Sequence, residues 1–183
     1  MVSTTERGAH GPAAVNGLPD GEFRDLLLSC CRAPGWADAV VAQRPFPTAT
    51  ALLDAADAAL AAAAEEDVDV ALAAHPRIGE RSAEASSRRE QAAALTADPA
   101  VLEELAAGNR AYEARFGHVY LVRAAGRGAD ELLALLRARL GNDRATERAV
   151  LRRELAEITR LRLARVLAGA ADGAPGAAPG RTS

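Results

Sequence analysis

The sequence predicts an all-α, single-domain protein, and three observations support that prediction. Ala and Leu, the strongest helix formers, dominate a chain that is 49% hydrophobic but only 3% aromatic. Apolar side chains recur at helical spacing between residues 18 and 168, where runs of β-branched residues are scarce. Gly and Pro fall at the ends of these periodic segments. We therefore expect one bundle of about seven to eight helices in the 183-residue chain.

The two ends of the chain lack this periodicity. Residues 1–17 and 169–183 are rich in Gly, Ala, Pro and Ser. Such composition is typical of disordered segments, so we expect two disordered tails around a helical domain that spans residues 18–168. His10 falls in the first tail and is therefore a poor candidate for catalysis.

The first half of this domain contains four expected helices, each with a recognisable start or stop. In chain order they span about residues 23–33, 36–42, 48–65 and 67–75. Pro34 ends the first helix and Thr48 is placed to cap the third. Pro76 ends the fourth, because a residue that precedes proline is displaced from the α region.

Three further helices are expected near residues 99–116, 129–140 and 143–167. Asp98 before Pro99 is a favourable helix start, and Gly117 has the usual place of a helix C-terminal glycine. The stretch "HVYLVRAAG" at 118–126 is short, rich in β-forming residues and bounded by Gly. We expect it to be an extended segment between helices, in a chain whose other loop lies near residues 75–86.

Composition excludes several classes of function. The net charge is −3 and the pI is near 5.7, without the basic stripe of a nucleic-acid binder, so we expect no nucleic-acid partner. All 22 basic residues are arginines, which excludes Schiff-base, PLP-anchoring and P-loop lysines. No His-Glu-x-x-His or Glu-x-x-His pattern is present, so no metal site is expected.

The compartment follows from the cysteines and from the lack of targeting segments. Cys30 and Cys31 are adjacent and match no zinc spacing, so we interpret them as buried thiols in a reducing compartment. The sequence has no 18-residue apolar run, and residues 1–17 do not resemble a signal peptide. We therefore expect a soluble, cytoplasmic protein without a membrane partner.

His75 is the first candidate for chemistry, and two interpretations are open. A histidine at a helix end often contacts the carbonyl groups of the last turn, which is a structural role. However, Pro76 restricts its backbone and a loop with Pro, Gly and charged residues follows. Imidazole is also the side chain best suited to transfer protons near neutral pH.

The segment Ser87-Arg88-Arg89-Glu90-Gln91 also permits two interpretations. Ser-x-x-Glu is the pattern of a capping box, in which Ser87 and Glu90 each cover a backbone amide at a helix start. A helix start also collects free N–H groups and can bind an anion. The two functions are compatible, since Gln91 could face a pocket.

Arg162 lies on the apolar face of the last expected helix. With Leu151 placed at zero and about 100° per residue, Arg162 falls at about 20°. The other apolar residues of this face are Leu155, Ile158 and Val166. A buried guanidinium requires a carboxylate, another anion or carbonyl acceptors, so an ion pair and a ligand contact are equally open. Arg165 near the same face, and Arg127 in a loop, are weaker candidates.

Taken together, "HPRIG", "SRREQ", "YEARFGHVYLVRAAGR" and "LGNDRATERAVLRRELAEITRLRLARVL" resemble the 2-oxo-4-hydroxy-4-carboxy-5-ureidoimidazoline (OHCU) decarboxylase family, over essentially residues 18–168. The resemblance implies an all-α fold and the last step of urate degradation. That step is the decarboxylation of the small-molecule substrate OHCU to (S)-allantoin and CO2, without a cofactor. It also implies a homodimer.

The same resemblance implies the site residues. His75 matches the catalytic histidine, Glu90 the catalytic carboxylate and Arg162 the active-site arginine. The residues that match substrate-binding positions are Pro76, Ser87, Arg88, Arg89, Glu90, Gln91, Tyr120, Leu121, Val122, Arg123 and Ala124. The chain departs from many members at His118 and Val119.

Two other classes of function are also open. One is a non-catalytic all-α interaction module, in which Arg162 forms a structural ion pair while Ser87 and Glu90 only cap a helix. The other is a metal-assisted hydrolase, which the ligand spacings disfavour.

Overall fold

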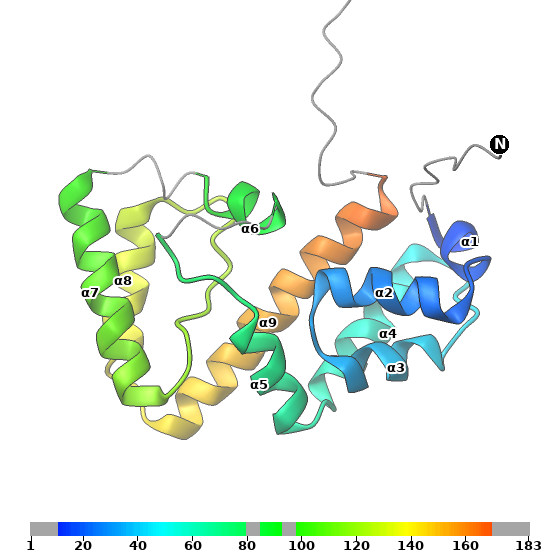
Figure 1. The fold of residues 1–183 in the computed structure, drawn as a ribbon, viewed down its shortest axis with the longest axis horizontal. Coiled ribbons are helices and arrows are strands. Elements are labelled where there is room, and N and C mark those ends of the chain that lie inside the picture. The colour runs from blue at the N-terminus through cyan, green and yellow to red at the C-terminus, as the bar shows by residue number, and fades with distance from the viewer. Residues whose placement is uncertain (1–10, 80–84, 93–97, 170–183) are drawn as a thin grey trace, which may run out of the picture.

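The computed structural model describes residues 11–79, 85–92 and 98–169, and these form nine helices (Figure 1). In chain order they are α1 (Gly11–Asn16), α2 (Asp20–Cys30), α3 (Pro34–Val41), α4 (Ala49–Ala61), α5 (Glu65–Ala73), α6 (Ala85–Glu90), α7 (Pro99–Phe116), α8 (Ala129–Arg139) and α9 (Arg144–Leu167). The predicted all-α class is confirmed. In the described part of the chain, no helix is sufficiently long and apolar to cross a bilayer.

Most helix boundaries follow local signals. The side chain of Asp98 accepts a hydrogen bond from Ala100 N at 2.8 Å, and Asp143 accepts one from Thr146 N at 2.8 Å. Gly117 ends α7 with a φ of 85°, a conformation that Gly adopts without a steric penalty. The segment from 118 to 128 contains no helix, as predicted.

The predicted tail over residues 1–17 is wrong for residues 11–16, which form α1. Val15 is fully buried, and the Asn16 side chain exchanges two hydrogen bonds with the backbone of Phe46, at 2.8 and 2.9 Å. Long-range contacts therefore hold this short helix. Residues 1–10, with His10, and 170–183 lie outside the described residues.

The helix expected over residues 48–65 is shorter than predicted. Thr48 caps α4 as expected, with its hydroxyl accepting from Ala51 N at 3.0 Å, but the helix ends at Ala61. Arg152 of α9 donates to the carbonyl oxygens of Ala61 and Ala63, at 3.3 and 2.7 Å. A distant arginine thus binds carbonyl groups at the end of α4, while the acidic first turn of α5 favours a new helix start.

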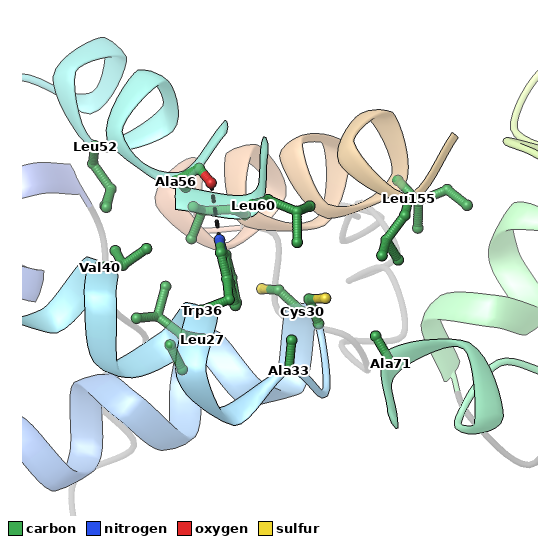
Figure 2. Close-up of a cluster of buried hydrophobic side chains, with 14 of the residues drawn as sticks. Leu27, Cys30, Ala33, Trp36, Val40, Leu52, Ala56, Leu60, Ala71 and Leu155 are labelled. Atoms are coloured by element: carbon green, nitrogen blue, oxygen red, sulfur yellow. Dashed lines mark hydrogen bonds between the residues drawn. The ribbon is translucent and has the colours of Figure 1, made fainter. Parts of the chain in front are cut away.

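The buried side chains form two hydrophobic clusters. The first cluster lies among α1 to α5 and α9, around Trp36, whose indole N–H donates to the Ala56 carbonyl at 2.9 Å (Figure 2). The second cluster contains Ile78, residues of α7 and α8, and part of the segment between them. In Figure 1, α9 crosses the molecule between the α7–α8 pair and the α2–α4 group.

The segment at 120–124 lies where the two clusters meet. Leu121 belongs to the first cluster, whereas Tyr120, Val122 and Ala124 belong to the second. Neighbouring side chains therefore point to opposite sides, as in extended backbone. This alternation confirms the extended segment that the sequence predicts.

Candidate active site

A small cavity of about 20 Å³ lies at this junction between the two clusters. Its walls come from the end of α5 and the loop after it, from α6, from the extended segment and from α9. The lining residues are His75, Pro76, Ile78, Ser87, Glu90, Gln91, Leu121, Val122, Ala124, Ile158 and Arg162. The fold thus brings together the histidine, the carboxylate and the guanidinium that the sequence singled out.

Arg162 forms a two-pronged ion pair with Glu90. Its Nε donates to Glu90 Oε1 at 3.0 Å and its Nη2 to Oε2 at 2.9 Å, and each side chain is 8% exposed. Arg162 also donates to Ser87 Oγ and to the Cys30 carbonyl, both at 3.3 Å. Arg162 is therefore a buried guanidinium with carboxylate and carbonyl acceptors, which confirms the prediction that it requires a carboxylate, another anion or carbonyl acceptors.

A second guanidinium lies close to the same carboxylate. Arg165, one turn further along α9, places Nη1 3.4 Å from Glu90 Oε1. The three charged groups carry one net positive charge, which favours an anionic ligand next to them.

Ser87 does not cap a helix as the capping-box interpretation required. Helix α6 begins two residues earlier, at Ala85, and Ser87 lies inside it, buried against the Arg162 guanidinium. The Ser87 hydroxyl oxygen therefore accepts a hydrogen bond from the buried Arg162 guanidinium and does not cap a backbone amide at a helix start. Ser87, Glu90 and Gln91 share one buried face of the chain at i, i+3 and i+4 spacing, while Arg88 and Arg89 are exposed.

Gln91 and Asn109 hold the loop that follows His75. The Gln91 side-chain oxygen accepts from Gly79 N at 3.0 Å, and Gly79 has a φ of 86°, which favours glycine. The Asn109 amide donates to the Ile78 carbonyl at 2.8 Å. Asn109 is not among the residues predicted from the sequence, although a polar residue four positions after Leu105 on an apolar helix face is a signal that could have identified it.

The imidazole of His75 is oriented by its own helix. Nδ1 lies 2.7 Å from the Ala71 carbonyl oxygen, which can only accept, so Nδ1 carries a proton. In the neutral ring, Nε2 is then the nitrogen that can take up a proton. The contact with a last-turn carbonyl expected for a structural histidine is present, and the same contact fixes the tautomer and the ring direction.

The extended segment contributes unevenly to the cavity. Leu121, Val122 and Ala124 line it, whereas the Tyr120 hydroxyl donates to the Leu132 carbonyl at 3.3 Å. The Arg123 side chain is partly exposed and pairs with Glu157 at 2.9 Å. Of the five predicted residues, the structure therefore places three at the cavity.

Cys30 and Cys31 are buried thiols behind this wall, as predicted. Burial raises the pKa of the Cys31 thiol to about 11, although a hydrogen bond with Thr159 and the positive charge of Arg162 oppose that shift. The Cys31 thiol is consequently protonated, and a poor nucleophile, near neutral pH.

A larger open hollow of about 760 Å³ lies elsewhere, between α5, the end of α7 and the start of α9. Its charged side chains are largely paired, since Arg148 lies 2.5 Å from Glu65 and 2.9 Å from Asp69. His118 lines this hollow and stacks against Phe116. We place the candidate site at the smaller cavity because its charged groups are buried and converge. Among the described residues, no three His, Cys, Asp or Glu side chains gather as a metal site would require.

The structure is thus an all-α fold in which His75, Glu90 and Arg162 line one small cavity between helices. The family model described as OHCU decarboxylase matches residues 16–164. The chain belongs to the OHCU decarboxylase family, and the resemblance seen in the sequence is confirmed.

Solved structures and a curated relative agree with this assignment. A crystal structure of OHCU decarboxylase in the presence of (S)-allantoin matches with a TM-score of 0.71 and 28% identity, over 78% of this chain and 97% of that one. A structure of (S)-allantoin synthase shares the fold, with a TM-score of 0.67 and 18% identity, over 85% of this chain and 54% of that one. The uric acid degradation bifunctional protein TTL of Arabidopsis thaliana is 28% identical over 145 residues, which are 75% of this chain. The match covers 45% of that relative's length.

Proposed function

We propose that this protein decarboxylates OHCU to (S)-allantoin and CO2, the last step of urate degradation, without a cofactor. The observation that supports this most directly is the convergence of His75, Glu90 and Arg162 on one buried cavity in a member of the OHCU decarboxylase family. Had the three side chains lain on separate surfaces, only a helical scaffold would be left.

The substrate itself can accept the electrons that the reaction releases. Its carboxylate is attached to C4, next to the ring imine. When the bond from C4 to the carboxylate breaks, CO2 leaves and the electron pair moves through a new ring double bond to the imine nitrogen, which takes up one proton. The C4 hydroxyl then loses its proton to become a carbonyl group, and the neighbouring carbon gains one. The protein must therefore supply position, charge and directed proton transfer.

The charged groups suggest how these tasks are divided. The net positive cluster of Arg162, Arg165 and Glu90 attracts the anionic substrate, and the Arg162 guanidinium pairs with an anionic or carbonyl group of it. Glu90 orients the C4 hydroxyl, and Nε2 of His75 takes the proton from it. Return of a proton to one face of the ring yields a single enantiomer.

The cavity is about the size of one water molecule. Binding of a substrate with an imidazoline ring and a ureido group therefore requires the lining side chains to move apart. The Glu90–Arg162 pair is the lining contact that an anionic ligand can replace most directly, because a carboxylate offers the guanidinium the same two acceptors.

We also propose binding roles for the other predicted residues of α6 and of the loop after His75. Pro76, Ser87 and Gln91 shape the wall beside His75, while Arg88 and Arg89 add positive charge on the exposed side of α6. We further propose a homodimer in the cytoplasm, with residues 18–168, against which α1 packs, as the catalytic domain. Sedimentation velocity of the purified protein tests the dimer.

The non-catalytic interaction module is the second candidate, and one observation favours it. The Arg162–Glu90 pair is buried and joined by two hydrogen bonds, as a purely structural pair would be. That candidate predicts no enzymatic activity and no thermal shift with urate-derived ligands.

Replacement of His75 by Ala tests the enzymatic proposal. OHCU is generated from urate with the upstream enzymes, and (S)-allantoin is followed by circular dichroism. Loss of the group that moves a proton should lower kcat by roughly 10²–10⁴-fold in the folded variant. His118→Ala, which removes an imidazole outside the cavity, is the matched control and should retain wild-type kcat. Normal turnover by folded His75→Ala protein would refute this role.

A further inference from the structure

A second buried ion pair lies outside the cavity, between Arg139 at the end of α8 and Glu147 in the first turn of α9. Arg139 donates to Glu147 Oε1 through Nε at 2.8 Å and Nη2 at 2.5 Å, and the two side chains are 7% and 0% exposed. The Tyr112 hydroxyl donates to Oε1, and Asn142 donates to Oε2 at 2.7 Å. The charges are thus paired and hydrogen-bonded, as a buried ion pair requires.

The remaining nitrogen of Arg139 binds the extended segment. Nη1 donates to the Leu121 carbonyl oxygen at 2.6 Å, and the guanidinium lies 4.8 Å from the centre of the Tyr120 ring. A guanidinium is planar and rigid, so its attachment to Glu147 fixes the direction in which Nη1 donates. The position of the Leu121 carbonyl is therefore set by the junction between α8 and α9.

The next peptide group is held by another charged side chain. The Arg123 N–H donates to Glu154 Oε2 at 2.7 Å, and Glu154 belongs to α9, two turns before Arg162. Arg127 lies 4.0 Å from the same carboxylate oxygen. Two successive peptide groups are consequently fixed by Arg139 and Glu154, which we call the backbone clamp.

The backbone clamp determines where the peptide groups of Val122 point. Residues 119–124 run without a turn or bend, and in extended backbone the N–H and C=O groups of successive residues alternate in direction. The Leu121 C=O and the Arg123 N–H are both held on the same edge of the extended segment. Because directions alternate from residue to residue, the N–H and C=O of Val122 point to the opposite edge of the segment. Val122 is 2% exposed and lines the cavity, and within the described ranges neither of these groups has a hydrogen-bond partner.

We propose that Arg139 and Glu154 are positioning residues, which hold one edge of the segment 121–123 so that the Val122 N–H and C=O are aligned for the ligand. An adjacent donor and acceptor match the N–H and C=O edge of a ureido group or a cyclic urea. The inference rests on the proposed function, because OHCU and (S)-allantoin both carry such groups.

Replacement of Glu154 tests the backbone clamp. Glu154→Leu removes the acceptor for the Arg123 N–H, whereas Glu154→Gln keeps a side-chain oxygen that accepts the same hydrogen bond. The KM for OHCU and the Kd for (S)-allantoin should rise by roughly 10²-fold in Glu154→Leu, because two buried hydrogen bonds between the Val122 backbone and the ligand are weakened, and both constants should recover in Glu154→Gln. Glu157→Leu is the matched control, since Glu157 pairs with the Arg123 side chain and not with the backbone, and both constants should stay near wild type.

A second variant tests the Arg139 half of the backbone clamp. Single removal of Arg139 would leave the Glu147 charge buried without its partner, so the double variant Arg139→Met/Glu147→Leu replaces both groups by apolar ones. It loses the contact with Leu121 and should show the same rise in KM and Kd. Unchanged KM and Kd in folded Glu154→Leu and in the folded double variant would overturn the inference.

A separate readout distinguishes this inference from the proposed function. A wild-type protein that neither turns over OHCU nor binds (S)-allantoin contradicts the proposed function. Amide hydrogen exchange over residues 119–124 then still tests the backbone clamp. Faster exchange in Glu154→Leu than in Glu157→Leu supports it, and equal exchange rates overturn it.

Discussion

Arg162 combines a structural role in the fold with the chemical role that we propose for it. Removing a guanidinium and a carboxylate from water is costly, and the cost is offset only when both are well paired. Here Glu90, Ser87 and the Cys30 carbonyl satisfy the guanidinium at four short contacts. Under the proposed function, any single substitution at Arg162 should therefore change folding stability and activity together.

A paired substitution separates the two roles. Arg162→Met should lower the free energy of unfolding by about 3–5 kcal/mol, because the Glu90 charge stays buried without its main partner. Arg162→Met/Glu90→Leu should recover most of that stability, yet form no (S)-allantoin. Urea unfolding and the circular-dichroism assay measure the two quantities.

Arg160→Met provides the control for this pair. Arg160 is two positions away on α9, partly exposed and paired with Asp54 and Asp57, so its loss should cost no more than about 1 kcal/mol. Activity in the double variant would contradict the enzymatic role and favour the interaction module.

For single residues, the sequence predicts which charged side chains are buried more readily than it predicts which residues they contact. The helical period alone selects Arg162 as a buried charge, because the apolar face is a local property of α9. Its partner Glu90 lies 72 residues earlier, and no local pattern connects the two. The capping-box interpretation of Ser87 is wrong for the same reason, since that pattern contains no information on the arginine that packs against the serine.

At the level of elements, the correctly predicted boundaries are those stabilised by neighbouring residues. Thr48, Asp98, Asp143 and Gly117 act within one turn of the helix they start or end. The end of α2 also differs from the prediction, because that helix stops at Cys30 and Pro34 instead begins α3. The differing boundaries of α1 and of the end of α4 depend on contacts with residues far along the chain. Composition and periodicity do not contain such contacts.

The pairing of α7 with α8 depends on a close approach at Gly108. A Cβ atom at this position would lie 2.5 Å from Leu136 Cδ2 and 3.2 Å from its Cγ, and Leu136 is fully buried. Gly108→Ala should therefore lower the free energy of unfolding by about 1–2 kcal/mol through overpacking, despite the better helix propensity of Ala.

Gly21 provides the matched comparison for Gly108. It is an exposed helical glycine of α2 with no atom within 4 Å of an added Cβ, so Gly21→Ala should stabilise by up to about 1 kcal/mol. Urea unfolding of both variants measures the difference. A stabilised Gly108→Ala variant would show that α7 and α8 pack less closely than described.

At the scale of the whole molecule, the candidate site lies where the two hydrophobic clusters meet. Leu121 and Ile158 come from the first cluster, and Ile78, Val122 and Ala124 from the second. The sequence predicts one helical domain correctly in class. It does not predict the division of the core, because an apolar face does not specify which other face it will cover.

This division gives the protein two natural optical probes. Its single tryptophan, Trp36, belongs to the first cluster, and both tyrosines, Tyr112 and Tyr120, belong to the second. Trp fluorescence and Tyr absorbance therefore report on separate halves of the interior. Because α9 and the 120–124 segment join the halves, both signals should change at the same urea concentration, whereas two separate midpoints would reveal halves that melt independently.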